Sequence, residues 1–327
     1  MTRSADPFNA QRNANRRSVY VAGLLTLAAA TAVTQMRSRA ALRQNRPLGR
    51  FIDADGVRLH VVEKGRGDPL VLLHGNSSFT ADFLTSGLVD LAARKYRVLV
   101  FDRPGYGHSA RLPGGRIDPE LQAGIIHAAL RRLGAERPIV LGHSWGTLVA
   151  LAMALDFPGK IHGLVLEAGY LYPQPRLDLF LLSQLAMPVL GDAARHSFAP
   201  LVGRMFWKGL LRQLFAPQPV PRHFRQFPAW MVLRPEQMRT SADELAGLLE
   251  ASARLSRRYR ELGLPLVILS GRGDRLVDPR FHSERLHAEL PRSEYRAYPE
   301  MGHMLHHLLP EEVMRAVDDL ARRPTGR

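Results

Sequence analysis

Three residues far apart in the chain have the types and the order that covalent catalysis needs. Ser144 is the centre of residues 142–146, Gly-His-Ser-Trp-Gly, which form a G-x-S-x-G pattern. Asp274 and His303 follow it in that order. A serine hydroxyl attacks a carbonyl carbon at neutral pH only when a base removes its proton, and an acid must orient that base. The sequence therefore predicts Ser144 as the nucleophile, His303 as the base and Asp274 as the orienting acid.

The residues around Ser144 predict how it is held. The apolar residues 138–141 before it are typical of a buried strand, and residues 147–155 after it are typical of a helix. A strand, a tight turn and a helix in this order form a nucleophile elbow, in which the serine hydroxyl projects from the end of a sheet.

Asp274 and His303 are also expected in loops that follow strands. Asp274 comes after the apolar residues 265–271, and His303 comes after the alternating residues 294–298. Because the carboxyl ends of parallel strands meet at one edge of a sheet, we expect both side chains beside Ser144.

Other acids and histidines compete for these two roles. Asp278 is close to Asp274 and is either the acid or a helix N-cap. Glu167, after a predicted strand at residues 161–166, is a further candidate acid. His306 and His307 are interpreted as first-turn residues of the last helix, predicted near residues 310–320. Asp274 is preferred for its place at the strand end.

An oxyanion hole is predicted from two backbone N–H groups. One belongs to Trp145, directly after the nucleophile. The other is expected at Asn76, in the loop that follows the apolar residues 70–73. Two such donors stabilise the negative charge that develops on a carbonyl oxygen during attack.

Five motifs together resemble the signature set of the α/β-hydrolase superfamily. The resemblance is greatest to its bacterial esterases, haloperoxidase-like perhydrolases and proline iminopeptidases. It covers roughly residues 49–321 and is carried by residues 74–76 (HGN), 102–109 (DRPGYGHS), 142–146 (GHSWG), 271–274 (GRGD) and 302–303 (GH). It implies an α/β fold with a mostly parallel, doubly wound sheet and an inserted helical cap, and a structural role for Asp102.

The residue type at position 144 separates two kinds of chemistry within this superfamily. Haloalkane dehalogenases and epoxide hydrolases place an aspartate there, whereas this chain has Ser144. A serine suits attack on a carbonyl and formation of an acyl-enzyme. Enzymes of the proline iminopeptidase type also need acidic groups in the cap to bind a free amine. No such cluster is recognised in this sequence, which favours an esterase over a peptidase.

The domain boundaries follow from the alternation of strand and helix patterns. Residues 49–169 and 259–327 are predicted to form the catalytic domain, and residues 170–258 are predicted to be the cap. The cap segment is rich in proline and aromatic residues, which either form its own small core or cover an apolar pocket. Residues 1–48 precede the catalytic domain as a basic segment with an apolar run at about residues 19–36.

The apolar run is interpreted as an uncleaved single-pass membrane anchor. Its length lies between the core of a secretory signal and a full membrane span. A cleaved export signal and an exposed amphipathic helix therefore remain alternatives. Positive charge flanks it on both sides, at Arg12, Arg16 and Arg17 before it and at Arg37, Arg39, Arg43 and Arg46 after it. The chain has no cysteine, which rules out disulfides.

The charge of the chain is unevenly distributed. Of the net charge of +15, the first 50 residues carry +8 and residues 170–258 carry +6, so the rest of the chain is almost neutral. This distribution suggests that the N-terminal segment and the cap face something anionic. A general arginine bias is the alternative explanation. No nucleic-acid-binding motif accompanies the basic residues, and no nucleic-acid partner is expected.

The sequence thus predicts a membrane-tethered serine hydrolase that acts on a small-molecule ester or a lipid-like substrate. No metal ion or organic cofactor is expected. The alternatives are a non-catalytic ligand-binding or accessory protein with the same fold, and an aminopeptidase of the proline iminopeptidase type.

Overall fold

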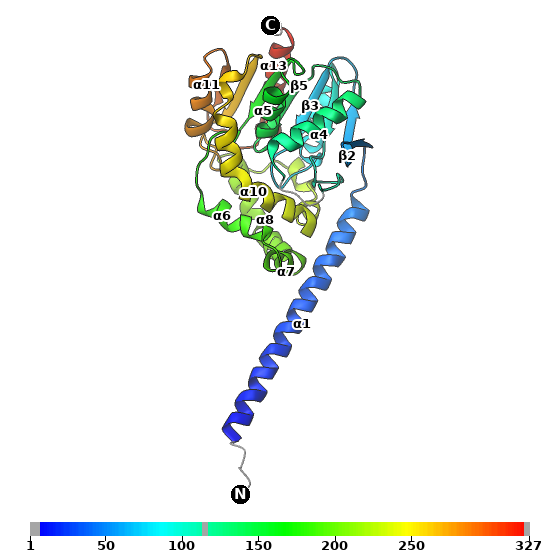
Figure 1. Cartoon of the computed structure of the whole chain (residues 1–327), viewed down its shortest axis with the longest axis vertical. Coiled ribbons are helices and arrows are strands. Elements are labelled where there is room, and N and C mark those ends of the chain that lie inside the picture. The colour runs from blue at the N-terminus through cyan, green and yellow to red at the C-terminus, as the bar shows by residue number, and fades with distance from the viewer. Residues whose placement is uncertain (1–6, 113–116, 324–327) are drawn as a thin grey trace.

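A computed structural model of the chain describes residues 7–112 and 117–323. Residues 1–6 of the basic N-terminal segment, and residues 113–116 and 324–327 of the predicted catalytic domain, lie outside the described residues. The fold is built on an eight-stranded sheet in the order β1-β2-β4-β3-β5-β6-β7-β8 (Figure 1). The strands are β1 (Arg50–Ala54), β2 (Val57–Lys64), β3 (Pro69–Leu73), β4 (Arg97–Phe101), β5 (Ile139–His143), β6 (Gly163–Glu167), β7 (Leu266–Gly271) and β8 (Glu294–Tyr298).

The sheet is parallel from β4 to β8, and the pairs β1–β2 and β2–β4 at its other end are antiparallel. Helices cover both of its faces, so the central strands are apolar on both sides. In β3, Val71 and Leu73 face the core under one layer of helices, while Leu70 and Leu72 face the core under the other. The predicted α/β fold with a mostly parallel, doubly wound sheet is confirmed.

The two helical layers come from different parts of the chain. The first core packs under α4 (Pro119–Arg132), α5 (Gly146–Asp156) and α11 (Arg285–Glu289). The second packs under α2 (Ala81–Ser86), α3 (Leu88–Ala92), the short α12 (Leu305–Leu308) and α13 (Pro310–Ala321). Helix α11 is preceded directly by a π-helical turn, η4 (Arg280–Glu284).

A helical insertion separates β6 from β7, within the segment expected to be the cap. It has a small core of its own, in which Phe215, Phe224, Phe227 and Met231 are buried against Phe79. Its elements are α6 (Leu177–Ser183), η1 (Gln184–Ala186), α7 (Leu190–His196), α8 (Ala199–Phe215), η2 (His223–Gln226), α9 (Ala229–Val232), α10 (Pro235–Ser256) and η3 (Tyr259–Glu261).

The N-terminal apolar run belongs to one long helix, α1 (Pro7–Gln44), which projects from the body beside the cap (Figure 1). Near its C-terminal end Thr34 is buried, and its hydroxyl donates a hydrogen bond of 2.6 Å to the carbonyl of Ser197 in the cap. Further toward the N-terminus, Tyr20 and Leu24 are exposed. Within the described part of the chain, α1 is the one unbroken helix long and apolar enough to cross a membrane, over Asn15–Gln44.

Candidate active site

Ser144 lies in the sharp turn between β5 and α5. Its φ angle is +52°, a left-handed conformation that costs a non-glycine residue roughly 1–3 kcal/mol. The backbone N–H of Ser144 donates a hydrogen bond of 2.8 Å to the carbonyl of Glu167. A Cβ atom on Gly142 would lie 2.6 Å from the Gly146 carbonyl oxygen, and one on Gly146 would lie 2.3 Å from the Leu73 carbonyl oxygen. The turn is therefore possible only with glycine on both sides.

His303 and Asp274 form a buried pair at the ends of β8 and β7. The distance from His303 Nδ1 to Asp274 Oδ2 is 2.7 Å. The other oxygen, Asp274 Oδ1, accepts hydrogen bonds from the backbone N–H groups of Leu276 (2.8 Å) and Val277 (3.0 Å). Burial raises the pKa of Asp274, but the His303 ring and these N–H donors lower it further, so the net shift is downward. Asp274 is thus held as a carboxylate against the imidazole.

Asp278 has a different role from Asp274. Its Oδ1 accepts a hydrogen bond of 2.9 Å from the backbone N–H of Arg280 at the start of the π-helical turn. This is the capping role that the sequence left open as an alternative for Asp278. The residue that contacts His303 is Asp274.

Ser144 and His303 line the same cavity. Because Asp274 occupies Nδ1 of His303, Nε2 is the ring nitrogen that can accept the serine proton. Over the described residues, no hydrogen bond joins Ser144 to His303. Such bonds are often long before substrate binds.

The loop after β3 and the start of α5 bring Asn76 and Trp145 to the wall of this cavity. The backbone N–H of neither residue donates to another group among residues 7–112 and 117–323. The Asn76 side chain is occupied separately, because its amide donates to Tyr106 Oη (3.1 Å), the Ser241 carbonyl (3.0 Å) and Glu244 Oε2 (2.9 Å). The amide is therefore held by the cap, and the backbone N–H is left for a ligand.

A buried ion pair between Arg103 and Glu244 holds this loop in place, and the sequence analysis missed it. Both side chains are fully buried, and their nitrogen and oxygen atoms are 2.5 Å apart. The Arg103 guanidinium also donates to the carbonyls of His74 (2.8 Å) and Gly75 (3.0 Å), and it lies 4.8 Å from the centre of the Trp145 ring. Because Glu244 belongs to α10, the pair joins the cap to both of the loops expected to hold an oxyanion.

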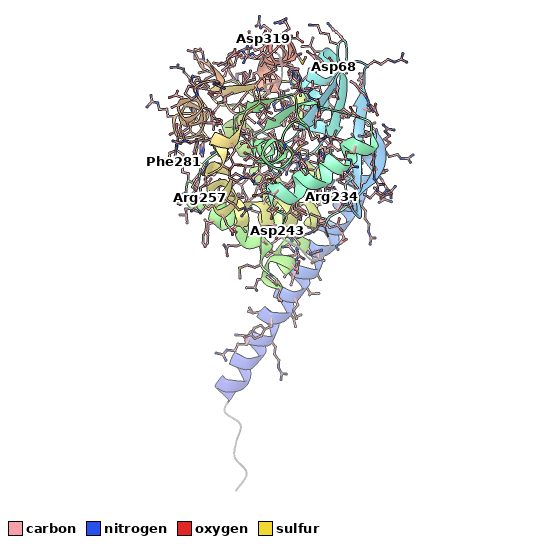
Figure 2. All side chains as sticks on the ribbon, turned by 45° about the horizontal axis from the view of Figure 1, so that its top comes forward. Asp68, Arg234, Asp243, Arg257, Phe281 and Asp319 are labelled. Atoms are coloured by element: carbon pink, nitrogen blue, oxygen red, sulfur yellow. The ribbon has the colours of Figure 1, made fainter. Side chains whose placement is uncertain are left out.

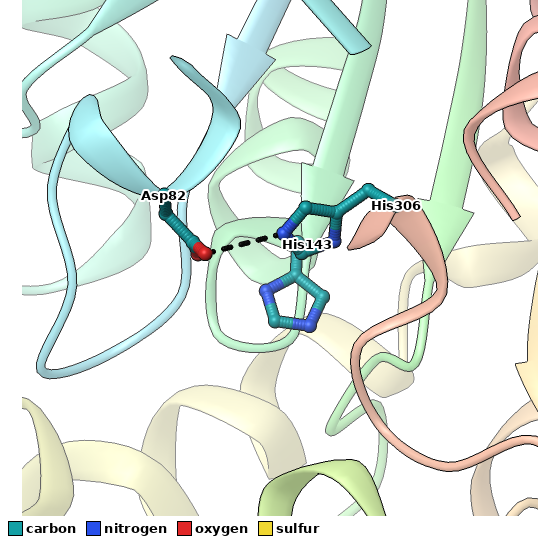
Figure 3. Close-up of side chains that lie close together, drawn as sticks. All are labelled: Asp82, His143 and His306. Carbon is teal, nitrogen blue, oxygen red and sulfur yellow. Dashed lines mark hydrogen bonds and ion pairs between the residues drawn. The ribbon is translucent and has the colours of Figure 1, made fainter. Parts of the chain in front are cut away.

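A second buried network lies beneath the nucleophile elbow (Figure 3). His306 lies between two carboxylates, with Nδ1 2.7 Å from Glu167 Oε1 and Nε2 3.3 Å from Asp82 Oδ1. Burial lowers the pKa of His306, but the two carboxylates outweigh burial and raise it to about 10. His307 also contacts Asp82, with its Nε2 2.8 Å from Oδ1.

The interpretation of His306 and His307 as first-turn residues of the last helix is wrong. They lie in the separate short helix α12, and both are buried against carboxylates from other parts of the chain. Glu167, the further candidate acid, contacts His306 and not His303. These partners are 139 and 225 residues away from the histidines, so local pattern could not reveal them.

His143 connects this network to the catalytic loop. Its Nε2 lies 3.1 Å from the backbone carbonyl of His303. Burial, followed by the charge on His306, lowers the pKa of His143 to about 3, so the ring is neutral at pH 7. The neutral ring donates from Nε2 to the His303 carbonyl, which ties the loop of the base to the strand of the nucleophile.

Asp82, His143 and His306 also have the composition of a metal site. One ligand atom from each lies within 4.8 Å of the others. However, both ring nitrogens of His306 already contact carboxylates, and its raised pKa keeps both of them protonated. A protonated imidazole offers no lone pair to a metal. The three residues fit a charge network better than a metal centre.

The cavity above Ser144 has a volume of about 410 Å³ and a mostly apolar wall. Among the charged residues at its wall, Arg176 and Asp178 pair with each other at 2.6 Å, and Asp82 contacts His307. Its apolar lining from the cap includes Leu179, Leu182, Trp207, Leu210, Leu214 and Phe227.

The fold is that of an α/β-hydrolase. The sequence profile of the alpha/beta hydrolase fold family matches residues 68–309, and the chain belongs to that family.

Its relatives carry out several different reactions. A haloalkane dehalogenase from Mycobacterium tuberculosis is 26% identical, with 82% of this chain and 93% of the relative covered. A 2-hydroxy-6-oxononadienedioate/2-hydroxy-6-oxononatrienedioate hydrolase from Paraburkholderia phymatum is 29% identical, with 76% and 85% covered. The solved structure of an esterase from Exiguobacterium antarcticum superimposes with a TM-score of 0.67 at 21% identity, covering 84% of this chain and all of that one.

Proposed function

We propose that this hydrolase is a membrane-tethered serine esterase that cleaves a small or lipid-like ester through an acyl-enzyme. The observation that carries the proposal is that Ser144, in a left-handed turn, shares a cavity with His303, whose Nδ1 is bound to Asp274. These positions support the roles of nucleophile, base and acid that acyl transfer requires.

The reaction follows from these positions. Ser144 Oγ attacks the ester carbonyl while His303 Nε2 takes its proton, and Asp274 stabilises the imidazolium that forms. The N–H groups of Asn76 and Trp145 stabilise the negative oxygen of the tetrahedral intermediate. His303 then protonates the leaving alcohol, and water, activated by the same imidazole, releases the acid and restores Ser144.

The contents of the cavity favour an apolar ester over the reactions named for the relatives. A dienedioate carries two carboxylates, whereas the one guanidinium described at the cavity wall, that of Arg176, is already paired with Asp178. Dehalogenation at saturated carbon suits a carboxylate nucleophile, and the nucleophile position holds Ser144. The Asp178 carboxylate is already paired with Arg176, so it is not free to bind the amino group of a peptide. This argues against an aminopeptidase.

A fluorophosphonate probe tests the proposal. The probe is expected to label the wild-type chain but not the Ser144→Ala variant. The esterase rate of that variant should be at least about 10⁴-fold lower. Ser77→Ala serves as the control, because Ser77 lines the same cavity outside the elbow and its loss should leave labelling intact. A folded wild-type protein that takes up no label would favour a non-catalytic role. p-Nitrophenyl esters of increasing acyl length would then define the substrate.

A further inference from the structure

Exposed apolar side chains gather in two places. Over the described residues, every large exposed hydrophobic side chain belongs to α1 or to residues 177–210 of the cap, except Leu48, Leu121 and Leu249. Contiguous apolar surface of this kind marks a contact with another apolar phase. We call the cap group the apolar cap face; it consists of Leu177, Phe180, Leu181, Leu182, Met187, Val189, Leu190, Phe198, Val202, Met205, Phe206 and Leu210.

The apolar cap face lies beside the helix that is long enough to cross a membrane. Figure 1 shows α7 and α8 at the end of the body from which α1 projects, and α1 contacts α7, α8 and α9. The hydrogen bond from Thr34 to the Ser197 carbonyl fixes this contact between α1 and the cap. Helix α1 cannot enter a bilayer without bringing the apolar cap face to its surface.

The composition of this part of the cap is itself that of membrane-associated helices. The segment Leu177–Ala186 and the segment Leu190–His196 together reach the hydropathy of a membrane span, but they meet at an angle of 90°. A pair bent in this way suits the interface between lipid and water better than the crossing of a bilayer.

Positive charge accompanies the apolar side chains on α8. Arg204, Lys208 and Arg212 are exposed and follow one another at intervals of four residues, which places them in one stripe along the helix. Met205 and Phe206, which are 70% and 64% exposed, lie next to that stripe. A surface helix with adjacent basic and apolar stripes is complementary to anionic lipid headgroups above acyl chains.

The catalytic cavity opens on this same face. Leu182 on α6 and Leu210 on α8 line the cavity, yet they are 52% and 41% exposed, so they lie at its mouth. Ser144 lies on the cavity wall. A molecule that enters past Leu182 and Leu210 therefore passes from the apolar cap face to the nucleophile.

We propose that the apolar cap face rests in the interfacial layer of an anionic bilayer, and that the substrate is a long-chain ester that enters the cavity directly from the lipid. This inference rests on the proposed function, because it names the source and class of the substrate for the same Ser144 site. It adds a second membrane contact that is independent of the anchor.

Single cysteines can test the contact, because the chain has none of its own. Full-length Leu190→Cys and Phe206→Cys would each carry an environment-sensitive fluorophore in vesicles of phosphatidylcholine and phosphatidylglycerol. Asp68→Cys is the matched control, since Asp68 lies at the end of the body opposite α1 (Figure 2). Leu24→Cys reports on the anchor separately.

We expect nitroxide lipids to quench the labels at positions 190 and 206, and aqueous iodide to quench the label at position 68. The inference is overturned if iodide quenches the labels at positions 190 and 206 as strongly as the label at position 68. In that case, a label at position 24 that is buried in lipid would show that α1 is nevertheless inserted in the membrane. The labels at positions 190 and 206 could also be protected from iodide in detergent, without vesicles, by a protein that forms dimers. That result would show that a second copy of the chain covers the apolar cap face, and it would equally overturn the inference.

A second experiment measures substrate entry. The double variant Leu190→Asp/Phe206→Asp changes two exposed residues outside the cavity lining. We expect at least about a tenfold lower rate on a long-chain ester embedded in vesicles, and an unchanged rate on soluble p-nitrophenyl acetate. Leu121→Asp, an exposed leucine on α4, should leave both rates unchanged. Equal rates of the double variant and wild type on the vesicle substrate would overturn the inference. If the wild-type protein does not hydrolyse p-nitrophenyl acetate, the proposed esterase function itself is contradicted.

Discussion

At the scale of single residues, the sequence predicts the local geometry where neighbouring residues determine it. The turn at Ser144 was predictable because the two glycines and the flanking strand and helix are all local in sequence. Asp274 could be preferred over Asp278 only by its place at the strand end, and the hydrogen bond to His303 distinguishes them directly. The buried role of His306 had no local indication, since its carboxylate partners come from α2 and β6.

The two neighbouring aspartates provide a matched pair of variants. Asp274→Asn removes the negative charge that orients His303 and stabilises its protonated form, so we expect kcat for ester hydrolysis to fall about 10³- to 10⁴-fold. Asp278→Asn keeps an oxygen that can accept from the Arg280 N–H, and its kcat should stay near the wild-type value. Steady-state kinetics on p-nitrophenyl butyrate would measure both. Equal losses in the two variants would contradict the assignment of Asp274.

The buried histidines predict a pH dependence. The pKa of His306 is raised to about 10 in the folded chain, above its ordinary value of 6.5. A group whose pKa is raised on folding stabilises the protein fully below its ordinary pKa, and this contribution is lost as the pH rises through the folded pKa. We therefore expect the free energy of unfolding to fall between pH 6.5 and about pH 10.

Nitrogen-15 spectra of the imidazole rings would check the individual sites. His306 should remain protonated at pH 8, while His143, whose pKa is lowered to about 3, should be neutral at pH 5. A His306 ring that titrates near pH 6.5 would show that the two carboxylates do not hold its proton.

At the scale of elements, the strands β3, β5, β6, β7 and β8 and the helices α5 and α13 were predictable from their apolar patterns, whereas the antiparallel strands β1 and β2 were not predicted. The packing of the cap was not predictable. Phe206 and Phe227 both belong to aromatic stretches of the cap, yet Phe206 is 64% exposed and Phe227 is buried. Whether an aromatic side chain faces the cap core or the outside depends on how the elements of the cap pack, and that is decided by contacts far apart in sequence. The Arg103–Glu244 pair is one such contact.

That pair gives a prediction about α10. Glu244→Gln leaves the buried Arg103 guanidinium without its anionic partner, which typically costs about 3–5 kcal/mol of stability. Because Glu244 also holds the Asn76 amide, kcat should fall as well. Glu250→Gln on the same helix weakens an exposed ion pair with Arg254, and should cost less than about 1 kcal/mol. Urea denaturation would compare the two, and equal midpoints would contradict the structural role of Glu244.

At the scale of the whole molecule, the sequence indicated an apolar N-terminal segment but not its relation to the cap. The apolar run was expected at about residues 19–36, whereas the helix continues to Gln44. Its last turns are part of the folded body, since Ser38 and Ala41 are buried. The long N-terminal helix and the cap are therefore packed together as one structural unit.

Truncation of α1 tests this arrangement. Deleting residues 1–32 removes most of the apolar run but keeps Thr34, so the chain should stay active and should leave membranes at a lower detergent concentration than the full-length chain. Deleting residues 1–47 also removes the Thr34 hydrogen bond and the buried Ala41, and should cost roughly 2 kcal/mol or more of stability. Release of the shortened and full-length chains at the same detergent concentration would contradict the anchor.

The continuity of α1 has one further consequence. A helix of 38 residues is about 57 Å long, and no loop interrupts it between its exposed part and the part packed on the cap. Such a stalk has no hinge, so a body that stands on it keeps a constant height and tilt. Large soluble substrates would be sterically excluded from the space between the body and the membrane. The enzyme and its ester would then meet by diffusion within the plane of the membrane. Turnover would then follow the mole fraction of ester in the leaflet, and not its concentration in the bulk solution.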